Sequence, residues 1–335
     1  MISELRVTTV AVADLERSCA FYADTFDYVS LGEGAIGGRE AELAWQMPSG
    51  LTGRAVVMGP AGAVTGLLRL VQFNAAQFNA AQFNAAQFDA ARFDAEQCGI
   101  TGEPYWGDYS RPQDYGHYAL NIRVPDIRSA IERLRAAGGR SKSEPTHWTV
   151  TPDLSAWDSL SYDPDGIVLD VFELEPGEGS ALADYDGRPS ELQTVAMHVS
   201  DARASASFYK ALGFVELYDK LIENMESFFR LPRGTGLHNI NLYVPGGTLN
   251  GRVELAQYVG FPGRQQRDRA VPPNLGILSV SLETDDLKAT ADLVEGLGAE
   301  PVCAPVEVDL PPYGPALVQT FFGLDGEILE FYQCR

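Results

Sequence analysis

The sequence predicts an α+β protein built from four tandem copies of one pattern, an apolar strand followed by a helix that an Asp caps. Residues 7–28 and 194–214 share the strand, the capping Asp and a Phe-Tyr pair seven residues after it. Residues 118–139 and 278–299 lack that pair, but each has a Gly twelve residues after the capping Asp. Because the two kinds of copy alternate, we infer that a pair of copies was duplicated.

The strand that ends each copy also recurs. The first and third copies end in GLLRLVQF (66–73) and GRVELAQY (251–258), and the second and fourth in DPDGIVLDVFEL (163–174) and GLDGEILEFYQC (323–334). These matches extend the repeat over nearly the whole chain.

An acidic, Gly- and Pro-rich stretch without apolar periodicity lies between the two halves, which is typical of a linker. We assign the linker to residues 175–190. The halves on either side are then a first module pair, residues 1–72 plus 98–174, and a second module pair, residues 191–335.

Residues 73–97 form an insertion of five pentads, each headed by Phe. Phe73 and Gly116 are 43 residues apart whereas their counterparts Tyr258 and Gly276 are 18 apart, and the difference of 25 equals five pentads. A period of five matches neither a helix nor a strand. An ordered coil similar to pentapeptide repeats, a helix and a mobile segment remain alternatives. A role in forming a homodimer or in covering a site is a hypothesis.

Composition excludes several classes of function. The hydrophobic fraction of 45% and charged fraction of 21% are those of a globular protein. A net charge of -21 without a basic run disfavours nucleic acid and anionic membranes as partners. The acidic N-terminus lacks a signal-peptide pattern, and the four cysteines lack C-x-x-C spacing. We therefore expect a cytoplasmic protein that binds a small molecule.

Taken in order, these elements resemble the vicinal oxygen chelate superfamily, which includes glyoxalase, bleomycin-resistance proteins and extradiol dioxygenases. The resemblance rests on the strand, the capped helix with Phe-Tyr, the further strands and the D-P-D-G turn before the last strand. It implies four βαβββ modules paired into two curved-sheet domains, each enclosing a cavity.

The family's metal ligands match poorly. Many members have a His seven residues before the capping Asp, where this sequence has Val7, Ala119, Thr194 and Ser279. The family carboxylate on the last strand corresponds to Arg69, Asp170, Glu254 and Glu330. An extradiol iron centre needs two imidazoles and one carboxylate. Because these positions depart from the family pattern, we expect no metal ligand and no cofactor here, with a divalent metal in a shifted site as the alternative.

The remaining polar residues on these strands predict two cavities. In the first half we expect Arg69 and Asp170 to pair, or Arg69 or Arg123 to hold an anionic substrate. In the second half we expect Glu254, Glu330 and His198 to act as catalytic acids and bases. The substrate-binding candidates beside them are Thr194, Ser279, Glu283, Asn241 and His238.

Three functions fit this pattern. The first is a metal-independent enzyme of lyase, isomerase or hydrolase type that acts on a small apolar or aromatic carbonyl compound. The second is a ligand-sequestering binding protein of the resistance type. The third is an extradiol dioxygenase-like metalloenzyme with an atypical metal shell.

Overall fold

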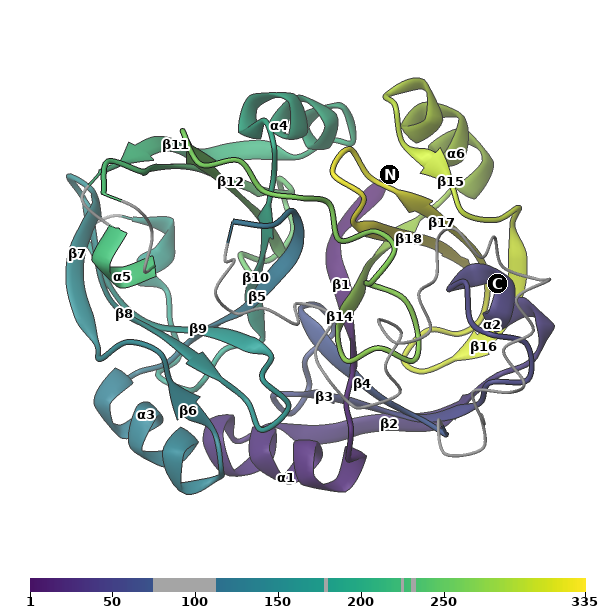
Figure 1. Cartoon of the computed structure of the whole chain (residues 1–335), viewed down its shortest axis with the longest axis horizontal. Helices are drawn as coiled ribbons and strands as arrows, with labels where there is room; N and C mark the ends of the chain where they lie inside the picture. The colour runs from purple at the N-terminus through teal and green to yellow at the C-terminus, as the bar shows by residue number, and fades with distance from the viewer. Residues whose placement is uncertain (75–112, 178–179, 224–225, 230–232) are drawn as a thin grey trace.

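The computed structural model describes residues 1–74, 113–177, 180–223, 226–229 and 233–335. Within these residues, four modules form two mixed sheets of nine strands each (Figure 1). The predicted α+β class with four βαβββ modules is thereby confirmed. The predicted insertion lies almost wholly outside the described residues.

The first half of the chain contains two modules, with short extra elements in both. The first module consists of β1 (Ile2–Ala11), α1 (Leu15–Phe26), β2 (Val29–Ile36), α2 (Arg39–Ala44), β3 (Gly53–Gly59) and β4 (Leu67–Phe73). The second consists of β5 (Gly116–Arg123), α3 (Ile127–Ala136), β6 (Arg140–Ser141), β7 (Thr146–Thr151), β8 (Leu154–Tyr162) and β9 (Val168–Pro176). A short 3-10 helix, η3 (Ala181–Ala183), follows in the predicted linker.

The second half repeats this order. The third module consists of β10 (Leu192–His198), α4 (Ala202–Ala211), β11 (Val215–Ile222), α5 (Glu226–Phe229), β12 (Gly236–Tyr243) and β13 (Arg252–Val259). The fourth consists of β14 (Gly276–Thr284), α6 (Leu287–Gly296), β15 (Glu300–Pro301), β16 (Val306–Leu310), β17 (Gly314–Phe322) and β18 (Ile328–Cys334). The Asp predicted to cap α1, α3, α4 and α6 is the N-cap of each and accepts a backbone N–H bond.

The modules do not pair in chain order. One sheet runs β15-β17-β18-β14-β1-β4-β3-β2, so it joins the first module to the fourth through the antiparallel pair β1–β14. The other runs β11-β12-β13-β10-β5-β9-β8-β6 and joins the second module to the third through β5–β10. The expectation that consecutive modules share a sheet is therefore wrong.

The helices explain how two sheets with this pairing stay together. Figure 1 shows α1 beside α3 along one side of the molecule, and α4 and α6 along the opposite side. One hydrophobic core lies under α1 and α3, and a second lies under α4 and α6. Each core contains buried residues from both sheets, such as Val10 and Leu169 in the first and Leu282 and Leu255 in the second. Burial of this shared apolar surface holds the two sheets against each other.

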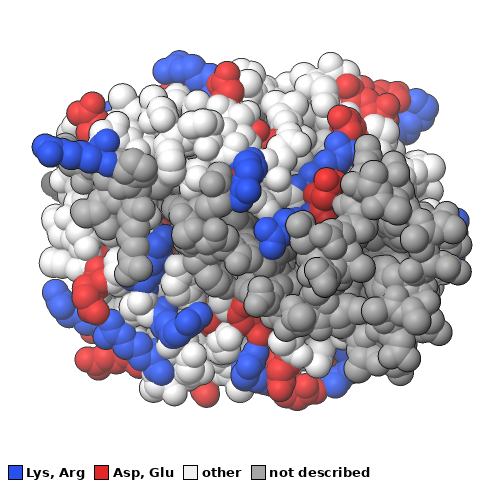
Figure 2. All heavy atoms as spheres, viewed as in Figure 1, with Lys and Arg blue, Asp and Glu red and all other residues white. Residues whose placement is uncertain are grey.

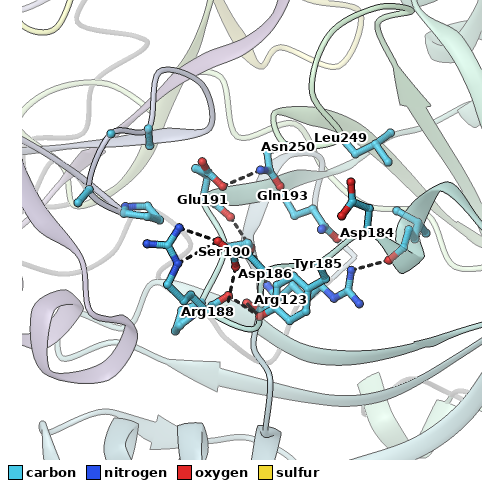
Figure 3. Close-up of a pocket in the computed structure, with 16 residues that line it drawn as sticks. Arg123, Asp184, Tyr185, Asp186, Arg188, Ser190, Glu191, Gln193, Leu249 and Asn250 are labelled. Atoms are coloured by element: carbon cyan, nitrogen blue, oxygen red, sulfur yellow. Dashed lines mark hydrogen bonds and ion pairs between the residues drawn. The ribbon is translucent and has the colours of Figure 1, made fainter.

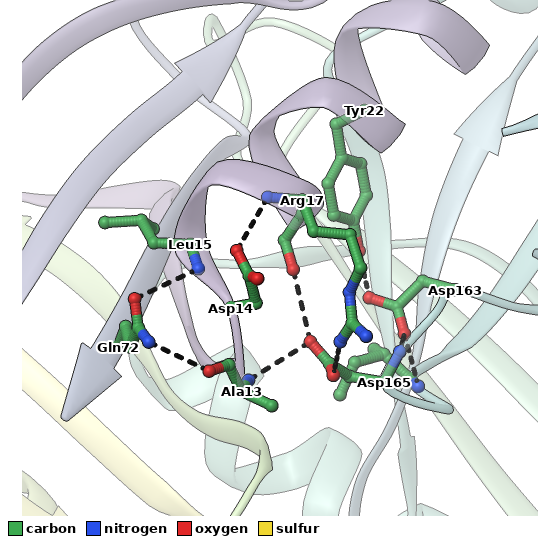
Figure 4. Close-up of polar contacts among 10 residues, drawn as sticks. Ala13, Asp14, Leu15, Arg17, Tyr22, Gln72, Asp163 and Asp165 are labelled. Carbon is green, nitrogen blue, oxygen red and sulfur yellow. Dashed lines mark hydrogen bonds and ion pairs between the residues drawn. The ribbon is translucent and has the colours of Figure 1, made fainter. Parts of the chain in front are cut away.

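A polar contact adds to the core between the first two modules (Figure 4). The turn before β9 carries two buried aspartates that face α1. Asp165 accepts hydrogen bonds from the Arg17 guanidinium and, at 3.1 Å, from the Ser18 hydroxyl. The Tyr22 hydroxyl donates to Asp163 at 3.2 Å. Burial, together with the charge of Asp165, raises the pKa of Asp163 to about 7.

The third and fourth modules repeat this contact with different side chains. The Ser200 N–H, just before α4, donates to Asp325 at 3.0 Å, and the Asp325 N–H donates to Glu327 at 3.0 Å. Burial and the charge of Asp325 raise the pKa of Glu327 to about 7. Helix contacts thus follow chain order, while sheet pairing does not.

The acidic charge is not gathered in one visible patch. Figure 2 shows Lys and Arg side chains interspersed with Asp and Glu side chains on the face that it presents. No helix among the described residues has the length and apolar character needed to cross a bilayer.

Candidate functional site

The two sheets bring equivalent residues together at their centres. In the first sheet, Arg69 lies on β4 opposite Thr9, and Glu330 lies on β18 opposite Ser281. In the second sheet, Glu254 lies on β13 opposite Ala196, and Asp170 lies on β9 opposite Asn121. By the internal repeat, Arg69 corresponds to Glu254, and Glu330 corresponds to Asp170. One centre therefore holds an Arg and a carboxylate, and the other holds two carboxyl groups.

We call the first centre the filled site, with residues Thr9, Trp45, Arg69, Ser281, Tyr313 and Glu330. Arg69 Nη2 lies 3.2 Å from Glu330 Oε1, and both side chains have 0% exposure. Both oxygens of Glu330 accept further bonds, Oε2 from Trp45 Nε1 at 2.7 Å and Oε1 from Ser281 Oγ at 2.6 Å. Glu330 therefore has no face open to a substrate.

Arg69 is equally enclosed in the filled site. Its Nε and Nη2 donate to Thr9 Oγ1 at 3.1 and 2.7 Å, and Nη1 donates to the Tyr313 hydroxyl at 2.7 Å. The guanidinium also lies 5.1 Å from the centre of the Trp45 ring. Burial lowers the pKa of Arg69, but Tyr313 and Glu330 outweigh it and raise that pKa. The ion pair occupies the place where the sequence predicted a cavity.

Two expectations about shared cavities are therefore wrong. Arg69 pairs with Glu330 and not with Asp170, because β4 and β9 belong to different sheets. For the same reason Glu254 and Glu330 do not share a cavity. Glu283 also belongs to the first sheet, where it lies 3.3 Å from Arg6 Nε near the surface.

We call the second centre the cavity site. A cavity of about 60 Å³ opens there, lined by polar and apolar side chains. The polar ones are Asn121, Trp148, Asp158, Asp170, Gln193, Thr194, Tyr218, Asn241, Arg252 and Glu254. The apolar ones are Val150, Leu154, Ala156, Phe172, Leu174, Leu182 and Leu217. A set of polar groups among apolar side chains is typical of a small-molecule site.

Glu254, which lines this cavity, is held by three hydrogen-bond donors. Its Oε2 accepts from Asn121 Nδ2 at 2.7 Å and from Thr194 Oγ1 at 3.1 Å, and its Oε1 accepts from Asn239 Nδ2 at 2.7 Å. Burial and the neighbouring Asp170 raise the pKa of Glu254, while the bonds from Asn239 and Thr194 oppose this shift. These bonds fix the carboxyl group in place and favour its ionised form.

Asp170 lies against a second buried carboxyl group, that of Asp158 on β8. Burial and the mutual charge of the pair raise the pKa of Asp170 well above its ordinary value, and burial raises the pKa of Asp158. Asp158 Oδ1 and Asp170 Oδ1 have no hydrogen-bond partner among the described residues. Two buried carboxylates in contact repel each other, so the pair retains one proton near neutral pH.

Arg252 supplies positive charge at the edge of the same cavity. Its side chain is buried, and its Nη2 donates to Gln193 Oε1 at 2.9 Å. Its Nε and Nη1 lack a partner within the described part of the chain. Burial lowers the pKa of Arg252 to about 10, which leaves the group charged at neutral pH. Two unpaired buried donors on a guanidinium fit an anionic oxygen of a ligand.

The other predicted site residues divide between the two sheets. Thr194 and Asn241 line the cavity. His198 lies at the end of β10, stacked on Tyr118 with ring centres 3.9 Å apart, and is not among the cavity-lining residues. His238 Nε2 lies 2.6 Å from Asp219 Oδ1 on the outer strands, and Ser279 belongs to the first sheet.

The sequence alone did not identify two important residues of the cavity site, Arg252 and Asp158. Arg252 is two positions before Glu254 on one strand, so period-two alternation puts both on one face and could have indicated it. Asp158 lies outside the repeated segments, so the repeat gave no indication that it belongs to the site. Its approach to Asp170 depends on the antiparallel pairing of β8 with β9, in which Asp158 lies opposite Phe172.

The donor groups do not fit the metal centre that the resemblance implies. The filled site holds a guanidinium at a ligand position, and the cavity site offers amides, carboxyl groups and a guanidinium but no imidazole. Among the described residues, no three His, Cys, Asp or Glu side chains lie close enough together to hold an ion. An imidazole-rich centre has no ligand set here.

A family model matches the first two modules. The model for the Glyoxalase/Bleomycin resistance protein/Dioxygenase superfamily matches residues 5–171. The chain belongs to this superfamily. The match spans the first two modules, and the repeat extends the same pattern to the third and fourth.

Solved structures extend the likeness over the whole chain. Glyoxalase I from Zea mays superposes with a TM-score of 0.62 at 17% identity, covering 99% of this chain and 92% of that one. A putative dioxygenase from Bacillus subtilis superposes with a TM-score of 0.55 at 11% identity, covering 98% and 84%. At these identities the likeness concerns the fold. No curated protein sequence matches the chain significantly.

Proposed function

We propose that this superfamily member is a metal-independent acid/base enzyme, of lyase, isomerase or hydrolase type, whose reaction takes place at the cavity site. The substrate class that we propose is a small carbonyl compound with an apolar or aromatic part. One observation carries the proposal: Glu254 and the Asp158–Asp170 pair, all with raised pKa, face one cavity beside a partly unpaired Arg252.

Glu254 is the proposed base. Its three hydrogen-bond donors stabilise the carboxylate, while burial keeps its pKa above the ordinary value. A carboxylate with a raised pKa is a stronger base than one in water, so it suits proton removal from carbon near neutral pH.

Asp170 is the proposed acid. Because Asp158 and Asp170 repel each other when both are ionised, the pair carries a proton that it can give up to a reaction intermediate. The pKa of both groups is raised, but three hydrogen-bond donors stabilise the Glu254 carboxylate, whereas Asp170 lies against a second carboxyl group. This difference in surroundings is the basis for assigning the base role to Glu254 and the acid role to Asp170.

Arg252 is the proposed binder of the reacting oxygen. Glu254 removes the proton next to the carbonyl group, and the electrons of the broken C–H bond move onto the carbonyl oxygen as an enolate. Arg252 Nε and Nη1 donate to that oxygen, where its charge develops. Asp170 then protonates another carbon, which gives isomerisation, or protonates a leaving group, which gives elimination.

Deuterium exchange tests this proposal with a panel of candidate compounds in place of the natural substrate. The protein is incubated in heavy water with α-keto and β-keto acids, and loss of the proton signal next to the carbonyl group is followed by NMR. We expect exchange with at least one acid, lowered about hundredfold or more by Glu254→Gln. Asp170→Asn should leave this exchange in place and lower only the formation of product, because Asp170 acts after the proton is removed. Glu295→Gln, on the exposed side of α6, is the matched control.

Two results would contradict the proposal. Full exchange by Glu254→Gln would remove Glu254 as the base. Tight binding of a panel member that Arg252→Gln weakens, without exchange or product, would instead support the ligand-sequestering alternative.

A further inference from the structure

A second, larger pocket, drawn in Figure 3, shares lining residues with the cavity site. It has a volume of about 520 Å³ and lies where the linker meets turns of the first and third modules. Its lining combines eight residues between 182 and 191, in the linker region, with residues 60–63 of the β3–β4 turn and with Leu249 and Asn250 before β13. We call it the outer pocket. Its volume is within the range of pockets that hold a drug-sized molecule.

The outer pocket and the cavity have two lining residues in common, Leu182 and Gln193. Both are buried, with exposures of 6% and 4%. Gln193 also accepts the hydrogen bond from Arg252 Nη2 at 2.9 Å. Leu182 and Gln193 therefore lie between the two spaces, and Gln193 contacts the proposed anion-binding group.

Arg123 determines where Leu182 lies. Its Nη1 donates to the Leu182 carbonyl oxygen at 2.8 Å, and its guanidinium lies 3.9 Å from the centre of the Tyr185 ring. Its backbone N–H donates to Ser190 Oγ at 3.0 Å. Figure 3 shows Arg123 and Tyr185 together at one side of the outer pocket. The linker is thus fixed against β5 at several points and forms part of the wall.

The sizes of the two spaces differ greatly. The 60 Å³ cavity has room for a small head group or about two water molecules, whereas the outer pocket has 520 Å³. The polar groups of the outer pocket include Asp184, Glu191 and Asn250, and its apolar part includes Leu182 and Leu249. A ligand whose head reaches Arg252 and whose body extends into the outer pocket meets residues of both kinds.

We propose that the outer pocket is the second part of the binding site and that the ligand is an elongated organic anion. Its anionic head lies on Arg252, its apolar middle passes Leu182 and Gln193, and its hydrogen-bonding end lies in the outer pocket. Leu182 is then a specificity-determining residue that belongs to the linker and to none of the four modules. This inference rests on the proposed function, which accounts for the anionic head of the ligand. It adds the length and polarity of the remainder of the ligand.

Binding of two probes tests the inference. The probes are acetate, which represents the head alone, and ω-hydroxydodecanoate, which has an anionic head, an apolar chain and a polar end. Affinities are measured by NMR titration for the wild type and for Leu182→Trp, Leu182→Ala and Arg252→Gln. Leu293→Trp on α6, where Leu293 is 39% exposed, is the control.

We expect the long probe to bind more tightly than acetate. Leu182→Trp narrows the passage and should weaken the long probe about tenfold or more, with acetate changed less than about twofold. Leu182→Ala widens the passage and should leave the long probe bound at least as tightly as in the wild type. Arg252→Gln should weaken both probes.

The outcomes separate the two proposals. If Arg252→Gln weakens both probes but neither Leu182 variant changes their ratio, the outer pocket is not part of the site and only this inference fails. If Arg252→Gln leaves both probes unchanged, or if neither probe binds the wild type, the anion-binding role of Arg252 fails and this inference fails with it. If Leu182→Ala is folded but its affinity for both probes falls by the same factor, Leu182 has only a structural role.

Discussion

The filled site and the cavity site are built on the same strands of two equivalent sheets, yet they neutralise buried charge in opposite ways. In the filled site Arg69 and Glu330 compensate each other, and Trp45, Ser281 and Tyr313 saturate the remaining donors and acceptors. In the cavity site Glu254 stands where Arg69 stands in the other, so two carboxyl groups face each other. The excess negative charge is relieved by raised pKa values and leaves polar atoms unpaired.

The comparison shows how a repeated fold separates stability from function. A self-compensated centre is rigid and offers nothing to a ligand. A centre with unpaired buried groups costs stability, and ligand contacts offset that cost. The surroundings of the two sites differ in the same sense, because Trp45, at the end of α2, donates a hydrogen bond to Glu330 in the filled site, whereas apolar side chains such as Leu154 and Leu217 line a cavity in the other.

The largest expected effect comes from breaking the filled site. Arg69→Met leaves the Glu330 carboxylate buried without its partner, so the free energy of unfolding should fall by about 3 to 5 kcal/mol. Urea unfolding followed by circular dichroism measures this. The double variant Arg69→Met with Glu330→Met removes both charges and should cost less than the single variant. An equal or greater loss in the double variant would contradict the compensation.

The next effect concerns the dependence of stability on pH. The pKa of Asp163 and that of Glu327 are both raised to about 7 by burial, so each group favours the folded state while it is protonated. Stability from these groups is complete below their unfolded-state pKa values and is lost as the pH rises through about 7.

Asp163→Asn should remove one half of this dependence. Between about pH 5 and 8 the decline in unfolding free energy, on the order of a few kcal/mol in the wild type, should become clearly smaller in the variant. Denaturant midpoints measured across that range test the sign. Stability that rises with pH in the wild type and is unchanged in slope by Asp163→Asn would contradict the assignment.

A substitution in the cavity site should act in the opposite direction to Arg69→Met. Asp170→Asn replaces a carboxyl group with a raised pKa by a neutral amide beside Asp158, so it should stabilise the fold by about 1 to 2 kcal/mol above neutral pH. The gain should vanish at acid pH, where Asp170 is protonated in any case. A loss of stability at alkaline pH would show that Asp170 is compensated by a partner in the way that Glu330 is.

The smallest effect concerns the helices. Arg133 on α3 donates to both carboxylate oxygens of Asp27, after α1, at 2.6 and 3.2 Å. Because Arg133 is partly exposed and Asp27 largely exposed, Arg133→Ala should lower the unfolding free energy by about 1 kcal/mol or less. Thermal unfolding at low and high salt measures it. A loss several times larger would mean that this ion pair, and not the shared core, holds the first two modules together.

Sequence reasoning reached the repeat because its signals are local. The capping Asp14, Asp126, Asp201 and Asp286 each act within one turn of their helix, and the fold confirms all four. The strand carrying each carboxylate position was also located correctly. Such features depend on neighbours in the chain and are therefore visible in the sequence.

The partners of these residues depend on long-range pairing, which the repeat does not specify. Both pairings of modules, consecutive or first with fourth, satisfy the same strand and helix patterns. Choosing the consecutive pairing put Arg69 beside Asp170 and Glu330 beside Glu254, and both contacts were wrong. Tyr313 and Trp45, which complete the filled site, lie outside the repeated segments and came into view only with the fold.

The most direct test of the difference between the two sites is a pH titration of the side-chain carboxyl groups by carbon-13 NMR. Comparison of the wild type with Asp170→Asn and Glu254→Gln assigns the signals of the cavity site. We expect the Asp158–Asp170 pair to retain a proton through neutral pH, the signal of Glu254 to titrate above its ordinary range, and Asp158 to titrate lower once Asp170 is replaced. If all three carboxyl groups were ionised by about pH 5, their ordinary behaviour would contradict an acid/base site in this cavity.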